Sequence, residues 1–211
     1  MKTIITMLLG CFIFGCSDDA HEMPPFAVDV DGVTIINPTG PSPKLLLLGD
    51  SRMHLAPWVK YFSNYITDYS KGGSTLGVVE ERLLKIQNYP SDIIIIQIGI
   101  NDLNGEADFD FIERYRNVMI QLKLNCTRVI VIGIINVPEW FTQYVNPNFR
   151  TGILHQYNDQ LRIITADLGI EYLDPCFLDV GQYLNANYSL DGVHLNDEGN
   201  ALFMEALKGM L

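Results

Sequence analysis

The chain has 211 residues, 48% of them hydrophobic, and a formal net charge of −11 at pH 7. This length suits one domain and this apolar fraction allows a sizeable core, so the composition excludes a disordered chain. The acidic balance opposes binding to phosphate backbones and to anionic lipid headgroups, so we expect no nucleic-acid partner. It is compatible with neutral substrates such as sugars or simple esters.

The N-terminus has the layout of an export signal. Lys2 precedes an apolar run over residues 3–14 that is too short to span a bilayer as a helix. The run ends in Ile-Phe-Gly before Cys16, which resembles the lipobox of bacterial lipoproteins, where the Cys is lipidated and becomes the new N-terminus. We therefore expect a signal peptide over residues 1–15, a lipid anchor at Cys16 as the only membrane contact, and export to the bacterial cell envelope, at the outer membrane or the cell surface. The alternatives are an ordinary signal peptide or a buried N-terminal helix.

Residues 16–43 are polar and contain prolines, which predicts a tether. Within them, residues 28–35 alternate between apolar and polar positions around an Asp-Gly pair, a signal for a β-hairpin. We expect this short hairpin to lie between the tether and a folded domain over residues 44–211.

Short apolar runs alternate with helical periodicity from residue 44 onwards. The expected buried strands are residues 45–48, 93–98 and 129–134, with weaker candidates at 66–69 and 170–173. Helical spacing of apolar residues is found over residues 76–86, 111–122, 157–168 and 197–210. This alternation predicts an α/β fold: a doubly wound, flavodoxin-like parallel sheet with helices on both faces. In such folds, sites form at the carboxyl ends of the strands.

Four motifs lie at these strand ends or in a late loop. They are Gly-Asp-Ser at 49–51, a segment with two glycines at 70–75, Gly-Ile-Asn-Asp at 99–102, and Asp-Gly-Val-His at 191–194. Each has an ordinary structural explanation when taken alone: a helix cap, a plain turn, an Asx-turn and a surface loop.

Together, and in this order, the four motifs resemble the blocks of the SGNH hydrolases, also called GDSL esterases, from about residue 44 to the C-terminus. The resemblance implies the SGNH hydrolase fold and a serine esterase activity that needs no metal or organic cofactor.

The resemblance also implies a role for each matching residue. Ser51 is expected to attack the ester carbonyl, His194 to act as its base, and Asp191 to orient the imidazole. The backbone N–H groups of Ser51 and Gly73 and the side-chain amide of Asn101 are expected to bind the oxyanion.

Two further carboxylates and one departure complete the comparison with the family. Asp50 and Asp102 are expected to support the loops on which they lie. Arg52 stands where the family commonly has an aliphatic residue. We expect its side chain to turn to solvent or to pair with a nearby carboxylate, the alternative being contact with an acidic group of the substrate.

The histidines and cysteines outside these motifs predict no metal site. His21, His54 and His155 have no acidic or Cys cluster at a metal-ligand spacing. Cys126 and Cys176 could form a disulfide in an exported protein, but two cysteines carry no framework pattern, so we favour separate thiols.

The motifs leave the substrate open. Residues 136–150 follow the fourth apolar run and hold four aromatic side chains, which suit stacking on sugar rings, lining an acyl pocket, or plain packing. A surface lipoprotein meets extracellular glycans, and no long apolar lid is evident. We therefore expect hydrolysis of acetyl or other short acyl esters on a carbohydrate or small molecule. The alternatives are a lysophospholipase or thioesterase, an acyltransferase using the same residues, and a catalytically inactive glycan-binding surface lipoprotein.

Overall fold

The centre of the molecule is a seven-stranded sheet with the strand order β1-β2-β4-β3-β5-β6-β7. The computed structural model describes residues 27–30, 33–89, 91–103, 110–147, 149 and 151–211. The strands are β1 (Ala27–Val30), β2 (Val33–Ile36), β3 (Leu45–Gly49), β4 (Ile66–Asp68), β5 (Ile93–Gln97), β6 (Arg128–Ile132) and β7 (Glu171–Leu173). From β4 to β7, every neighbouring pair is parallel.

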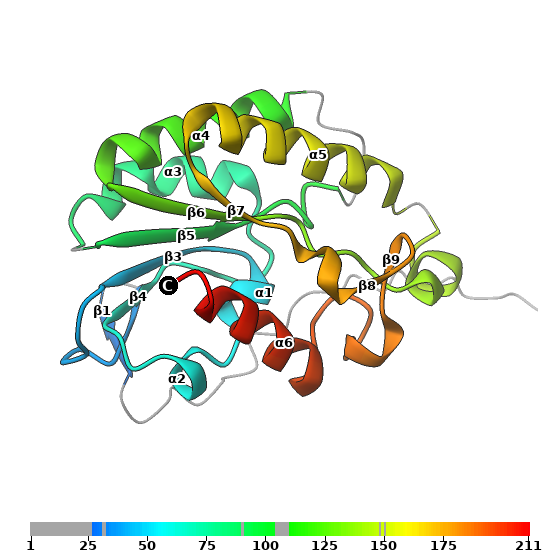
Figure 1. The fold of residues 1–211 in the computed structure, drawn as a ribbon, viewed down its shortest axis with the longest axis horizontal. Coiled ribbons are helices and arrows are strands. Elements are labelled where there is room, and N and C mark those ends of the chain that lie inside the picture. The colour runs from blue at the N-terminus through cyan, green and yellow to red at the C-terminus, as the bar shows by residue number, and fades with distance from the viewer. Residues whose placement is uncertain (1–26, 31–32, 90, 104–109, 148, 150) are drawn as a thin grey trace, which may run out of the picture.

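Helices cover both faces of this sheet, as predicted. The helices α3 (Leu76–Ile86), α4 (Phe111–Asn125) and α5 (Thr151–Leu168) lie on one face, and α1 (Ser51–His54), α2 (Trp58–Tyr61) and α6 (Asp197–Lys208) lie on the other (Figure 1). The parallel strands have the doubly wound order, in which the direction of chain progression reverses between β3 and β5. The predicted fold class is therefore confirmed, and this reversal point is where such a sheet holds its ligand.

The apolar runs of the sequence form strands because helices cover both faces. Successive side chains of a strand point to opposite faces. Leu46 and Ile94 accordingly belong to the core beneath α3, α4 and α5, and Leu45 and Ile93 belong to the core beneath α2 and α6. The central strands β3 and β5 therefore stay apolar along their length, and in β5 a polar residue, Gln97, appears only at the end.

The predicted hairpin joins the sheet. Strands β1 and β2 pair antiparallel, with Val30 opposite Val33, and β2 pairs antiparallel with β4. The hairpin is therefore not a separate element between tether and domain, and the sheet begins well before residue 44. The predicted signal peptide over residues 1–15 and the lipidation site Cys16 lie outside the described residues.

The chain after β7 contains short elements that periodicity did not reveal. These are the 3-10 helix η2 (Pro175–Leu178), the two-residue strands β8 (Asp179–Val180) and β9 (Tyr183–Leu184), and the 3-10 helix η3 (Ala186–Tyr188). They lead into a loop over residues 189–196 that precedes α6. In the described part of the chain, no helix is long and apolar enough to cross a membrane, and Cys126 and Cys176 carry free thiols.

Candidate active site

Ser51 lies at the junction between β3 and α1, at the carboxyl edge of the sheet. Asp50 is the N-cap residue of α1, and its carboxylate accepts a hydrogen bond from the backbone N–H of Arg52 at 2.9 Å. A capped helix start fixes the backbone on both sides of Ser51. Ser51 is only 5% exposed, so its hydroxyl is held in a defined and largely dry position.

The fold brings Ser51 together with His194 and Asp191. His194 Nε2 lies 2.8 Å from Ser51 Oγ, and His194 Nδ1 lies 2.7 Å from Asp191 Oδ2. The other carboxylate oxygen of Asp191 accepts the backbone N–H groups of Val193 and His194, at 2.9 and 2.8 Å. A continuous hydrogen-bonded chain therefore runs from hydroxyl to imidazole to carboxylate.

The electrostatics of Asp191 favour one arrangement of protons in this chain. Burial raises the pKa of Asp191, but hydrogen bonds from the His194 ring and from the backbone N–H groups of His194 and Val193 outweigh it, and the pKa lies well below its usual range. Asp191 is therefore an anion near neutral pH and accepts the proton on His194 Nδ1. In the tautomer that donates from Nδ1, the lone pair on Nε2 faces the Ser51 hydroxyl.

The loop that carries Asp191 and His194 rests on aromatic side chains. Gly192 has φ +97°, and a Cβ atom there would lie 2.4 Å from Phe141 Cδ2 and 2.9 Å from the Trp140 ring. Only glycine fits this approach and this backbone conformation. Phe141 and Phe149 are buried, with ring centroids 5.9 Å apart, whereas Tyr144 is 80% exposed. The aromatic segment after β6 therefore packs against the loop, and Tyr144 alone of these four projects mainly into solvent.

Gly73 and Asn101, the other residues expected around the oxyanion, lie on adjoining segments. Gly73 is exposed and has φ +71°. The side-chain amide of Asn101 donates to the Ser74 carbonyl at 2.8 Å, which uses one of its two N–H donors. The Asp102 carboxylate accepts the backbone N–H of Leu76, at 3.0 and 3.2 Å, where α3 begins. Asn101 and Asp102 thus tie the end of β5 to the segment that contains Gly73.

Asp50 is a buried acid beneath the nucleophile. Burial raises its pKa to about 6, although the charge of Arg52 and the N–H bond from the Arg52 backbone oppose this rise. The structure assigns it the capping role described above, which agrees with its expected supporting function.

The expectation that the Arg52 side chain turns to solvent was wrong. Its side chain is only 5% exposed and contacts backbone carbonyl groups instead of solvent. Nε donates to the Val193 carbonyl at 2.6 Å, Nη2 donates to the Asn136 carbonyl at 3.0 Å, and Nη1 donates to the Ile135 carbonyl. Burial lowers its pKa to about 10, so it remains a cation at neutral pH. The reason lies in α1, whose inner side faces the segment after β6 and the 191–194 loop.

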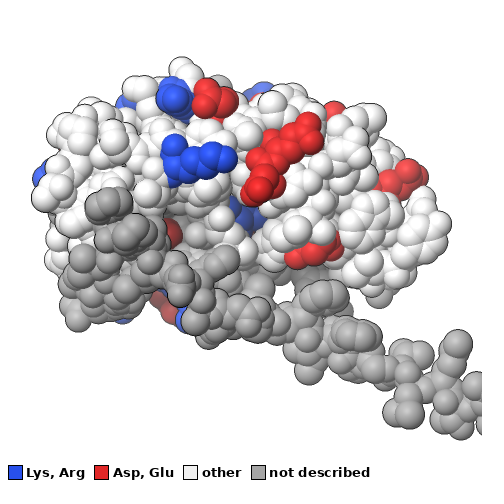
Figure 2. Space-filling model, turned by 90° about the horizontal axis from the view of Figure 1, so that it is seen from below, with Lys and Arg blue, Asp and Glu red and all other residues white. Residues whose placement is uncertain are grey.

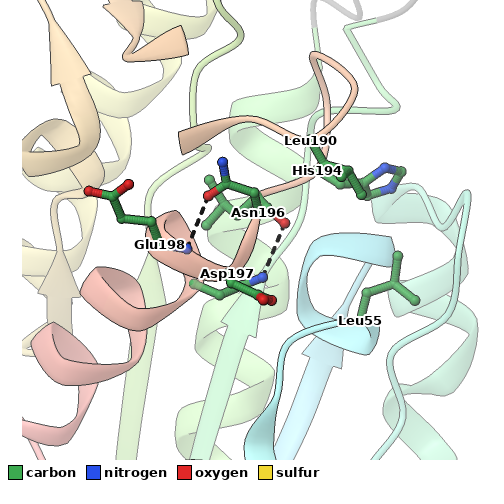
Figure 3. A pocket seen from close by; sticks show the side chains of 8 residues that line it. Leu55, Leu190, His194, Asn196, Asp197 and Glu198 are labelled. Carbon is green, nitrogen blue, oxygen red and sulfur yellow. Dashed lines mark hydrogen bonds between the residues drawn. The ribbon is translucent and has the colours of Figure 1, made fainter. Parts of the chain in front are cut away.

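A cavity of about 560 Å³ opens beside His194. It is lined by Leu55, Leu190, His194, Leu195, Asn196, Asp197, Glu198 and Asn200. Figure 3 shows His194, Leu55 and Leu190 on one side and the polar residues at the start of α6 on the other. Leu55 and Leu190 are 38% and 72% exposed, so this cavity has both an apolar and a polar wall.

Two further observations concern charge and metal ions. The face drawn in Figure 2 carries acidic and basic side chains scattered among uncharged ones, with no continuous basic surface among its described residues. Within the described ranges, no group of three or more His, Cys, Asp or Glu side chains is placed to hold a metal ion.

The site combines a serine at the junction of a strand and a helix with a histidine and a carboxylate, and it lies at the reversal point of a doubly wound sheet. This combination is typical of hydrolases. Residues 48–202 match the model of the GDSL-like lipase/acylhydrolase family. The chain belongs to this family and is a hydrolase of carboxylic esters, which confirms the resemblance drawn from the motifs. No curated protein matches the sequence significantly.

Solved structures of similar fold include hydrolases from two bacterial genera. A GDSL-like lipase from Bacteroides thetaiotaomicron superposes with a TM-score of 0.69 at 16% identity, covering 80% of this chain and 87% of that protein. An acetylxylan esterase from Geobacillus stearothermophilus superposes with a TM-score of 0.62 at 17% identity, covering 81% of this chain and 94% of that protein. At these identities the likeness establishes the shared fold.

Proposed function

We propose that this ester hydrolase uses Ser51 as nucleophile, His194 as base and Asp191 as the residue that orients His194, and that it removes acetyl or other short acyl groups from carbohydrate esters. The observation that carries the catalytic part is the chain of hydrogen bonds, at 2.8 and 2.7 Å, from Ser51 through His194 to Asp191. This order of groups also argues against the alternative of a binding protein that has lost catalysis.

The proposed reaction has two halves. Ser51 Oγ attacks the ester carbonyl carbon while its proton passes to His194 Nε2, and anionic Asp191 stabilises the imidazolium. The tetrahedral intermediate then expels the alcohol, which takes the proton from His194 and leaves an acyl group on Ser51. A water molecule repeats the sequence: it gives a proton to His194, attacks the acyl carbon and releases the acid, and Ser51 recovers its proton.

The negatively charged oxygen of each tetrahedral intermediate must be stabilised by hydrogen-bond donors. We assign this role to the backbone N–H groups of Ser51 and Gly73 and to the second N–H of the Asn101 amide. Support comes from the hydrogen bonds that tie Asn101 and Asp102 to the segment of Gly73, because donors held in advance stabilise developing charge without reorganisation.

The substrate proposal rests on the cavity beside His194. A cavity with polar groups along one wall suits a hydroxyl-rich alcohol next to a small acyl group. The acetylxylan esterase with the same fold makes acetylated glycans the first class to test. The second candidate is a lysophospholipid or thioester, which the exposed Leu55 and Leu190 favour because apolar side chains there can contact an acyl chain.

The deciding experiment measures kcat/KM for p-nitrophenyl acetate, butyrate and a long-chain ester, followed by acetylated oligosaccharides. The short-acyl proposal expects rates that fall with chain length and release of acetate from the sugar. A preference for the long chain would move the lipid or thioester candidate to first place. Faster transfer to an added alcohol than to water would identify an acyltransferase.

We further propose that the protein is exported and anchored by lipid at Cys16. The support is the lipobox-like sequence before this residue. Cys16→Ser is expected to release the protein from membrane fractions, and unchanged membrane association of that variant would refute the anchor.

A further inference from the structure

The Arg52 side chain links α1, the helix that begins with the nucleophile, to the loop that carries the base. Its guanidinium donates to three backbone carbonyls on two segments: those of Ile135 and Asn136 after β6, and that of Val193 in the loop. Arg52 directly follows Ser51 in the sequence, and Val193 directly precedes His194. One planar group therefore spans the distance between the two backbones that must stay aligned.

We propose that Arg52 is a positioning residue that sets the distance and angle between Ser51 and His194, an inference that rests on the proposed function of those two residues. The guanidinium is rigid and presents its donors in a fixed fork, so three bonds to backbone atoms leave it little freedom to tilt. The 191–194 loop is consequently fixed relative to α1.

The segment after β6, which accepts two of the three hydrogen bonds from Arg52, is itself held in place by the rest of the fold. The Asn136 amide donates to Asp179 Oδ2 at 2.6 Å, which ties the segment to β8. Asn136 is only 2% exposed, and Ile135 is buried as well. The Val193 carbonyl is therefore held against a buried and braced part of the fold, whereas the loop itself is partly open to solvent.

Neither leucine nor lysine at position 52 can reproduce all three of these hydrogen bonds. Leucine, the kind of residue expected at this position from the family, has no donor and would leave three buried or half-buried carbonyls without the Arg52 bonds. Lysine keeps the charge and can donate, but from a single nitrogen instead of a fork. Comparison of the two variants therefore separates the effect of charge from the effect of geometry.

The test compares Arg52→Lys and Arg52→Leu with the wild-type full chain on a short p-nitrophenyl ester. Titration with a fluorophosphonate that labels Ser51 counts active sites, so that kcat is obtained per site. A purely structural residue would change the number of active sites or the melting temperature but leave the per-site kcat unchanged. The matched control is Arg128→Leu, since Arg128 also donates to a backbone carbonyl, that of Met210, at the opposite edge of the sheet.

We expect the per-site kcat of Arg52→Leu to fall about a hundredfold, the scale for a displacement of about 1 Å at a reacting group, with KM unchanged. Arg52→Lys should be impaired to a smaller extent, and Arg128→Leu should keep the wild-type per-site kcat. A folded Arg52→Lys with the wild-type per-site kcat overturns the inference, and this variant decides if Arg52→Leu does not fold. If the wild-type protein shows neither Ser51-dependent turnover nor labelling, the proposed function fails, and the inference fails with it.

Discussion

The two sides of the site are built by different means. On the nucleophile side, Ser51 follows a buried strand, starts a capped helix and is 5% exposed. On the base side, His194 lies in a loop, and the Asp191 side chain is 46% exposed. The first side is fixed by neighbours in sequence, whereas the second is fixed by contacts with Arg52, Trp140 and Phe141, which lie far away in the chain. Substitutions on the two sides should therefore fail in different ways.

Ser51→Ala breaks the nucleophile side and has the largest expected effect. It removes the attacking oxygen, so kcat for ester hydrolysis should fall at least about ten-thousandfold. Thermal unfolding should change little, since the substitution deletes one oxygen atom. The matched control is Ser63→Ala, at an exposed serine before β4, which should hydrolyse esters at the wild-type rate. Wild-type turnover by Ser51→Ala would exclude the proposed nucleophile.

Asn101→Ala tests one of the hydrogen-bond donors proposed to bind the oxyanion, which lies on neither of these two sides. Loss of one oxyanion donor should lower kcat about a hundredfold to a thousandfold, with a smaller change in KM. The control is Asn125→Ala, because the Asn125 amide also donates to a backbone carbonyl but lies exposed at the end of α4. An unchanged kcat would mean that Asn101 only braces the Ser74 carbonyl.

Gly192→Ala should displace the loop on the base side without removing any group that takes part in the reaction. The new Cβ would collide with Phe141 and Trp140, so the loop must shift and His194 must move with it. We expect kcat to fall about a hundredfold. Gly181→Ala is the matched control, since Gly181 also has positive φ (+66°) but a Cβ there meets nothing within 4 Å. If both variants lose the same activity, the aromatic contact does not position the loop.

The same contrast explains what the sequence could predict. The strands and the start of α3 at Leu76 follow from local patterns: apolar runs, helical spacing and turn residues. The helix predicted over residues 157–168 begins earlier, at Thr151, and its buried face already includes Leu154, a position that the prediction left out. Arg52 was misjudged because a buried guanidinium depends on carbonyls from two remote segments. The strands β8 and β9 have two residues each, too few to show any periodicity.

Asp50→Asn tests how completely the nucleophile side is buried. Because the pKa of Asp50 rises from 3.8 to about 6 on folding, the native state holds its proton more tightly than the unfolded state. The free energy of unfolding of the wild-type protein should therefore fall, relative to Asp50→Asn, as pH rises from about 4 to about 6, by about 2–3 kcal/mol. Denaturant unfolding at several pH values measures this difference, and asparagine preserves the helix cap.

Asp174 supplies a control of opposite sign for that experiment. Burial raises its pKa, but the hydrogen bonds from Arg162 and from the Cys176 backbone outweigh this and lower it. The unfolded state then binds the proton more tightly, so the wild-type protein should lose stability relative to Asp174→Asn as pH falls below about 4. If the Asp50→Asn difference also ran in this direction, Asp50 would be stabilised as an anion by Arg52 more than it is destabilised by burial. Asp50 and Arg52 would then form a buried ion pair next to Ser51. The Arg52 cation would in that case stabilise the nucleophile side as well as the 191–194 loop.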